Sequence, residues 1–358
     1  MNKKIIGLLL VSMICSDIVV TAENYAILVS AGKATSDNQM INSEYWYDLF
    51  LIYEHLLLNE QYDSSKVFVF YGDGIDYNSS NNRYRKELHN WGQITDYNNS
   101  YYTLNSVISS LNSLITDDDN LLFYWVVGHG AKYQPLNVDS YYVLLRDNPD
   151  FPSDPNIEIV TKLELVELIN SITHYNKRKI FWMTCESGAM GEGTINANNN
   201  KTTLLTSSTS DENSYSDYFN YEYHTNFGYA LFCLSSGKYP NGNVCNVNQY
   251  CQSGEFADSL LNISELHSSI SSFILASSTN IHHPCKYDIG GISNKTFIGE
   301  SKRIKNVTID TNSAYWIDSL ELSSVLFDDN IDIDINIDKQ CKIIDNTYIP
   351  IGTTMSIK

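Results

Sequence analysis

The stretch Ile180–Gly193, IFWMTCESGAMGEG, runs from a short apolar segment through a cysteine into a glycine-rich turn. Short, nearly continuous apolar runs are typical of β-strands that are buried on both faces of a parallel sheet. Cys185 would then stand just beyond the carboxyl end of a strand. Functional groups collect at that edge of an open α/β sheet, because the loops leaving it border one crevice. Cys185 is therefore either a reactive thiol at a strand end or an ordinary core or disulfide-bonded cysteine.

Segments of two kinds alternate along most of the chain around this stretch. Apolar runs that predict strands are Tyr25–Ser30, Lys66–Tyr71, Leu121–Val127, Lys179–Thr184 and Thr202–Thr206. Amphipathic stretches that predict helices are Ser43–Asn59, Thr103–Ile115, Thr161–Ile172, Phe227–Ser235 and Glu255–Phe273. Strands that alternate with helices predict an α/β domain, with helices covering a largely parallel central sheet.

The end of the chain has a different pattern. Short β-like pieces, Lys305–Val307 and Ser324–Leu326, precede an Asp/Ile alternation at Asp328–Asp338 that favours an exposed strand or an acidic arm. We therefore expect an α/β domain over residues 23–290 and a β-rich extension over residues 291–358, whose role the sequence does not indicate. No internal repeat is found, which argues against a solenoid fold.

The first residues and the net charge indicate where the protein works. Residues 1–22 combine Lys3 and Lys4, a short apolar run and a small-residue ending, as expected of a cleaved secretory signal. No later stretch reaches the roughly 18 to 20 apolar residues that cross a bilayer, so we expect no membrane span. A formal charge of -19 argues against nucleic acid or an anionic membrane as partner. A secreted or a lysosomal or vacuolar location fits these features.

Glycosylation sites and cysteines agree with a secretory route. Candidate acceptor sequons begin at Asn78, Asn98, Asn200, Asn262, Asn294 and Asn306. Outside the leader the cysteines are Cys185, Cys233, Cys245, Cys251, Cys285 and Cys341. In an oxidising compartment an even number could form three disulfides, whereas a catalytic Cys185 would leave one of the others unpaired. Cys245 and Cys251 share a polar loop, and they could bridge each other or more distant partners.

A second predicted strand also ends in a reactive group, because Leu121–Val127 leads into Gly128-His129-Gly130. The helix between the two strands predicts a crossover that returns the chain parallel, which would bring both tips together. A thiolate, not a thiol, attacks a carbonyl, and a neighbouring histidine supplies the base and later the acid. The amides of Gly130 and Cys185 could form an oxyanion hole, at about 3 kcal/mol for each donor.

Two further stretches contain residue types that bind metals in other proteins, but neither has the spacing of a known metal site. His282-His283-Pro284-Cys285 has no second His or Cys pair at zinc-finger spacing, so a turn leading into a disulfide is favoured. Asp328–Asp338 lacks the glycine and the terminal glutamate of an EF-hand loop. We predict neither a metal site nor a cofactor.

The two motifs, together with Asn-Tyr-Ala-Ile-Leu-Val from Asn24 and Cys-Glu-Ser-Gly-Ala-Met from Cys185, resemble the legumain family. These asparaginyl endopeptidases belong to the caspase-like clan of cysteine peptidases, and the similarity covers residues 24–274. The resemblance implies a caspase-like three-layer sandwich, a catalytic His129 and a nucleophilic Cys185. It implies that Asn38 orients the histidine. It also implies that Glu186, Ser207 and Ser214 lie along the substrate.

The resemblance also has departures at the primary specificity pocket. Asparagine-selective members carry an arginine and a glutamate where this chain has Met40 and Met183, and an aspartate where it has Asn226. Opposed charges suit an amide side chain, whereas two methionines suit an apolar or long one. Gly128 replaces the aspartate usual before the histidine, and Gly-His-Gly is closer to the glycosylphosphatidylinositol transamidase subunit.

These features together predict a cysteine endopeptidase with a Cys-His dyad, a thioester intermediate and a primary pocket altered from the asparagine-selective type. Its partner would be a peptide or protein substrate, and its oligomeric state is not indicated. Two alternatives stay open: a catalytically inactive binding or surface protein on the same fold, and a peptide ligase or transamidase.

Overall fold

A computed structural model of the protein describes residues 23–32, 43–126, 129–132, 141–145, 158–194, 200–250, 261–296 and 298. Beyond these it gives backbone elements within residues 301–357, whose side chains are not described. The predicted leader at residues 1–22, and the candidate site residues Asn38 and Met40, lie outside the described residues.

The central sheet has six strands in the order β11-β8-β7-β3-β1-β2. Their bounds are β1 Asn24–Ser30, β2 Val67–Tyr71, β3 Asn120–Val126, β7 Lys177–Met183, β8 Thr202–Thr206 and β11 Cys285–Asp288. All neighbours pair in parallel except β11, which pairs antiparallel with β8 at one edge. The predicted α/β class with a largely parallel sheet is therefore confirmed.

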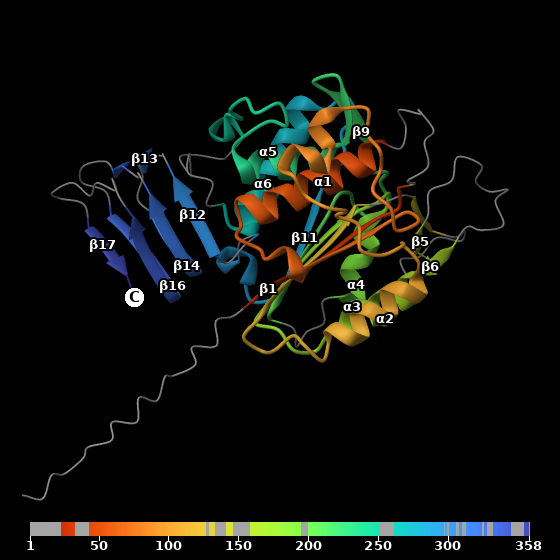
Figure 1. Ribbon diagram of the computed structural model, residues 1–358, viewed down its shortest axis with the longest axis horizontal. Coiled ribbons are helices and arrows are strands. Elements are labelled where there is room, and N and C mark those ends of the chain that lie inside the picture. Colours follow the sequence, from red (N-terminus) through yellow and green to blue (C-terminus); the bar gives the residue numbers. More distant parts are fainter. Residues whose placement is uncertain are drawn as a thin grey trace, which may run out of the picture.

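Two groups of helices cover the sheet on opposite faces (Figure 1). On one face lie α1 Ser43–Leu58, α5 Asn226–Ser236 and α6 Ile263–Ser277, and on the other lie α2 Tyr101–Leu111 and α3 Lys162–Asn170, with the short α4 Gly191–Thr194 beside α3. Successive strand residues point to opposite faces. In β1, Ala26 and Leu28 join the core under α1 and α5, whereas Ile27 and Val29 join the core over α2 and α3. Strands buried on both faces explain the continuous apolar runs in the sequence.

Smaller strand groups flank the main sheet. One is a three-stranded antiparallel sheet of β4 Gly130–Lys132, β5 Tyr141–Leu144 and β6 Ile159–Thr161. Another is the hairpin of β9 Ser216–Phe219 and β10 Glu222–Thr225. Both groups follow candidate site residues in the chain, the first after His129 and the second after Ser214.

The C-terminal strands form a sheet of their own in the order β12-β14-β16-β17, next to the short pair β13-β15 (Figure 1). Their bounds are β12 Ser301–Lys305, β13 Thr308–Ile309, β14 Ser313–Ser323, β15 Leu326–Phe327, β16 Asp332–Ile344 and β17 Thr354–Ile357. All pairs are parallel, and Ser301 lies opposite Ser319 while Ser313 lies opposite Ile333, 18 and 20 residues later.

Parallel neighbours at that short spacing mean that the chain coils, with β13 and β15 as the return strands. The β-rich extension is thus confirmed. This segment has a solenoid-like arrangement although its sequence has no repeat, because the parallel backbone pairing recurs without the same residues recurring. Among the residues that the structure describes, no helix has the length and apolar character needed to cross a membrane.

Candidate active site

The two predicted strand tips are neighbours. Strands β3 and β7 pair in parallel over their whole length, so that Val126 lies opposite Met183. His129 follows three residues after the first of these, and Cys185 two residues after the second. This register explains why the His129-Gly130 and Cys185-Glu186 segments lie close together at the carboxyl ends of the two strands.

Gly130 forms the contact between the two tips. A Cβ atom at this position would lie 2.7 Å from the carbonyl oxygen of Cys185 and 2.8 Å from Oγ1 of Thr184, distances that real side chains do not adopt. It would also lie 2.7 Å from the hydroxyl of Tyr141, which hydrogen-bonds Thr184. The glycine after His129 therefore allows the histidine segment to lie directly against the cysteine backbone.

The Cys185 thiol is free and partly buried, and its Sγ donates a weak hydrogen bond to the carbonyl oxygen of Ser214 at 3.6 Å. Burial raises the pKa of Cys185 above its ordinary value, and the nearby charge of Glu186 raises it further, against a lowering by the bond to Ser214. His129 is exposed at the same edge. The resting thiol is consequently protonated near neutral pH, and attack on a carbonyl requires a base to remove its proton.

The turn after Cys185 depends on an unusual backbone conformation. Glu186 has a φ of 54°, in the left-handed region, and then caps the short helix η6 Ser187–Met190. Its amide donates to the carbonyl oxygen of Glu212 at 2.7 Å. Burial raises the pKa of the Glu186 carboxyl, while Lys132 opposes that shift. A non-glycine residue in this region costs about 1–2 kcal/mol and is retained where the surroundings impose it, often at functional sites.

A cluster of buried hydroxyl groups supports the turn from behind. The Ser187 hydroxyl lies 3.2 Å from that of Ser207 and 3.1 Å from that of Ser208, and both of the latter donate to the carbonyl oxygen of Thr184, at 3.2 and 3.3 Å. Ser207 is completely buried. Its side chain therefore holds the Cys185 turn in place, and a direct contact with substrate would require it to leave this cluster.

Sequence reasoning did not identify His282 as a site residue. Its Nδ1 accepts a hydrogen bond from the amide of Tyr215 at 3.2 Å, next to the Ser214 carbonyl that receives the Cys185 thiol. Burial lowers the pKa of His282 to about 4, so its ring is neutral and able to accept this bond. The sequence signal was the HHPC run, where the expected outcome was a disulfide; instead Cys285 is a free thiol.

Two further contacts join the loops around Cys185. The Glu212 carboxylate accepts hydrogen bonds from Nδ1 of His283 at 2.6 Å and from its backbone amide at 3.1 Å. Nζ of Lys132, on the strand after His129, pairs with Asp211 at 2.5 Å. The His129 segment, the 209–215 segment and the 282–283 segment are therefore fastened to one another around the thiol.

Two predicted pocket residues lie inside the protein rather than at its surface. Met183 is 2% exposed and belongs to the core under α1 and α5. Asn226 is fully buried at the start of α5, where its side-chain amide donates to Asp217 and to the carbonyl oxygen of Asn280, both at 3.1 Å. Neither side chain is placed to contact a substrate in this arrangement. Of the predicted substrate-binding residues, Glu186 and Ser214 lie next to Cys185.

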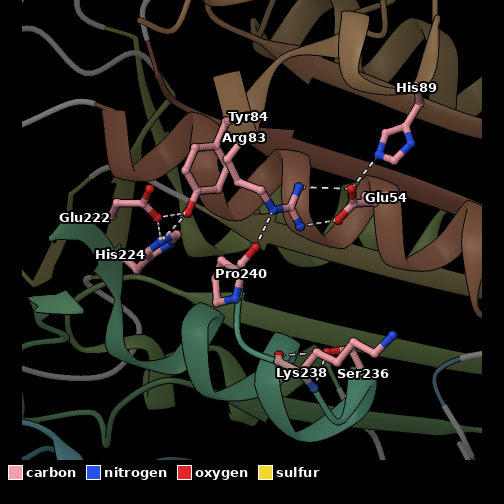
Figure 2. Close-up of polar contacts among 9 residues, drawn as sticks. All are labelled: Glu54, Arg83, Tyr84, His89, Glu222, His224, Ser236, Lys238 and Pro240. Carbon is pink, nitrogen blue, oxygen red and sulfur yellow. Dashed lines mark hydrogen bonds and ion pairs between the residues drawn. The ribbon is translucent and has the colours of Figure 1, made fainter. Parts of the chain in front are cut away.

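A second buried polar network fixes the β9–β10 hairpin to α1. His224 is completely buried, with Nδ1 2.7 Å from Oδ1 of Asp48 and Nε2 2.9 Å from the hydroxyl of Tyr84. Figure 2 shows Tyr84, Glu222 and His224 converging. Burial alone would lower the pKa of His224, but its hydrogen bonds to Asp48 and Glu222 raise it above the ordinary value. The network positions the hairpin that continues directly from Ser214 and Tyr215.

Comparison with solved structures finds 72 chains that match the protein. The protein is similar to a crystal structure of caspase-1 from Spodoptera frugiperda, with 11% sequence identity and a TM-score of 0.41 over 75% of this chain and 87% of that chain. No family model and no curated protein sequence matches the chain. A likeness at this identity and TM-score carries nothing about activity. The similarity to legumains stays a prediction that rests on the motifs quoted above.

Proposed function

We propose that the protein is a cysteine endopeptidase that uses Cys185 as nucleophile and His129 as general base. The observation that carries the proposal is the β3–β7 register, which sets the His129-Gly130 segment against the Cys185 backbone. A thiol with a raised pKa is weakly nucleophilic by itself, so the chemistry depends on the neighbouring imidazole. A free Cys185 thiol and an exposed His129, each following the carboxyl end of its strand, support this assignment.

The proposed reaction has two halves. His129 removes the proton from the Cys185 thiol as the sulfur attacks the scissile carbonyl carbon, and the amides of Gly130 and Cys185 donate to the oxyanion that forms. The imidazolium then protonates the leaving amine as the carbon–nitrogen bond breaks, which leaves a thioester on Cys185. In the second half His129 activates a water molecule, the water attacks the thioester, and the carboxylic acid and the free thiol are released.

The test is hydrolysis of a peptide library at several pH values by wild type, Cys185→Ala and His129→Ala. We expect a loss of at least about 1000-fold in kcat/KM for either variant, because removing either member of a nucleophile–base pair removes covalent catalysis. Asp118→Asn serves as the control, since this exposed acidic residue precedes β3 and lies at the opposite edge of the sheet. Undiminished hydrolysis by Cys185→Ala would refute the proposal.

The substrate preference belongs to the same proposal. We expect little cleavage after asparagine, since Met40 stands where asparagine-selective enzymes carry an arginine. The burial of Met183 removes it from this argument, which leaves Met40 as the residue to test. The library should show apolar or long side chains before the cut, and Met40→Arg should shift the preference toward amide or acidic side chains. Dominant cleavage after asparagine by wild type would contradict the expectation.

The same library separates the two alternatives. An inactive binding protein would leave all peptides intact, and its Cys185 would react with iodoacetamide at the same rate with and without His129. A ligase or transamidase would join an added amine nucleophile to the acyl half of the peptide, because the amine competes with water for the thioester. Mass spectrometry of the products distinguishes hydrolysis from transfer.

A further inference from the structure

Two buried cysteines outside the Cys185 site lie at the two ends of one tight loop. Cys233 is on α5 and is fully buried, and Cys245 follows the loop and is 3% exposed. Both are free thiols, and both belong to the core under α1 and α5. Neither takes part in the chemistry proposed for Cys185.

The backbone of the loop brings the two residues together. Helix α5 ends at Gly237, whose φ of 66° lets the chain reverse, and Gly242 turns it back with a φ of 85°. The amide of Cys245 then donates to the carbonyl oxygen of Gly237 at 2.9 Å. Gly237 lies about one helical turn beyond Cys233. The returning strand of the loop is therefore placed beside the last turn of α5, and the two thiols are within hydrogen-bonding reach of each other.

The loop is also held from outside. Nε of Arg83 donates to the carbonyl oxygen of Pro240 at 2.5 Å, while the guanidinium pairs with Glu54 of α1 at 2.6 Å. At the base of the loop the Ser236 hydroxyl accepts from the amide of Lys238 at 3.2 Å and donates to its carbonyl oxygen at 3.1 Å. Figure 2 shows the Arg83 contacts with Pro240 and Glu54 and the contact of Ser236 with Lys238. Non-covalent contacts thus already fix the position of Cys245 over α5.

We infer that Cys233 and Cys245 form a disulfide that closes the 233–245 loop. The oxidant is a low-molecular-weight disulfide such as oxidised glutathione. The Cys245 thiolate attacks one sulfur of that disulfide, which breaks its S–S bond and releases one glutathione thiolate. Cys233, as a thiolate, then attacks the Cys245 sulfur of the mixed disulfide and releases the second. Two protein thiols become one disulfide, one oxidised glutathione becomes two reduced ones, and the electrons balance.

The positions of the two thiols give the order of attack. Cys233 is fully buried within α5, whereas Cys245 lies on the loop and is 3% exposed. A local opening of the loop frees Cys245 while Cys233 stays in the helix, so Cys245 is the first nucleophile. The disulfide leaves Cys185 reduced, and it gives Cys245 a partner other than Cys251.

The experiment is refolding of the full-length reduced chain in glutathione buffers of increasing oxidised fraction, followed by alkylation and peptide mapping under non-reducing conditions. We expect one linked species that joins the Cys233 and Cys245 peptides and is split by reductant. Recovery of both cysteines in alkylated form at every ratio overturns the inference. A Cys245–Cys251 link found in its place overturns it equally.

Thermal unfolding supplies the second measurement. A disulfide across a loop of this length raises Tm by roughly 5–10 °C relative to the reduced protein. The Cys233→Ala/Cys245→Ala double variant should melt at the same temperature in oxidising and in reducing buffer. The matched control, Cys285→Ala, removes a half-buried thiol of another segment and should keep the full redox-dependent difference. The assignment is overturned if Cys285→Ala loses the difference in Tm between oxidising and reducing buffers. It is also overturned if Cys233→Ala/Cys245→Ala keeps that difference, even if this double variant is less stable.

Discussion

At the residue scale, the reactivity of Cys185 is set by its neighbours. Its pKa is raised by burial first and by the charge of Glu186 after that. We expect Glu186→Gln to lower this pKa and to speed alkylation by iodoacetamide near neutral pH by about two- to fivefold, because the thiolate is the reacting species. The measurement is the alkylation rate of Cys185 as a function of pH. Glu87→Gln, an exposed carboxylate on another segment, should leave the curve unchanged, and an equal effect of both substitutions would contradict the assignment.

His282 predicts a pH dependence of stability in the acidic range. Burial holds its pKa at about 4, against an ordinary value of about 6.5 in the unfolded chain. Between these values the unfolded state binds a proton that the folded state excludes, so the stability falls as the pH falls through this window. The full effect is about 3 kcal/mol. Urea unfolding at stepped pH should show a shallower acid loss for His282→Asn than for wild type, and parallel curves would refute this role for the imidazole.

At the element scale, the contact between β4 and the Cys185 turn depends on a glycine. Gly130→Ala places a methyl group 2.7 Å from the Cys185 carbonyl oxygen, and a backbone atom there has little freedom to move. We expect a stability loss of about 1–3 kcal/mol. The two strand tips should also move apart, with a fall of at least about tenfold in kcat/KM. Gly92→Ala, where nothing lies within 4 Å of the added atom, is the matched control. Wild-type turnover by Gly130→Ala would show that the contact is not required.

The elements that the sequence predicted are the ones with a strong local signal. The apolar run Lys179–Thr184 corresponds to β7 and the longer stretch Ser43–Asn59 to α1, because a short apolar run between turn signals is typical of a strand and a stretch of this length is typical of a helix. The hairpin β9–β10 gave no clear signal, since its residues are polar and its pairing is set by contacts such as that of His224 with Asp48. The role of His282 likewise depends on a tertiary contact with Tyr215. The proximity of the His129 and Cys185 segments was predictable because each follows the carboxyl end of one of two neighbouring parallel strands.

At the scale of the whole molecule, the sequence placed the change from the α/β domain to the extension after residue 290, where the composition alters. The contacts favour a later limit. The helix η8 Ile292–Lys295 packs against α6, and the amide of Ile263 donates to the carbonyl oxygen of Thr296 at 2.8 Å. Residue composition does not indicate that this segment belongs to the α/β domain, because backbone hydrogen bonds hold it there and such bonds do not depend on residue type. The domain limits of the sequence analysis therefore stay a prediction, to be tested by truncation.

Two truncations make that test, and Ile298 decides between them. Its carbonyl oxygen accepts from the buried Lys179 Nζ at 3.2 Å and from the Tyr62 hydroxyl at 3.1 Å, and its side chain is 2% exposed. A chain ending at residue 300 keeps these contacts, so we expect its Tm and its peptide hydrolysis to match those of the full chain. A chain ending at residue 290 loses a hydrogen bond to a buried charge and a buried aliphatic side chain, together at least about 3 kcal/mol, which should lower Tm by about 6 °C or more. If both truncated chains are destabilised equally, the coiled C-terminal strands are required for the stability of the central sheet. If both are as stable as the full chain, the α/β domain ends at residue 290, where the composition changes.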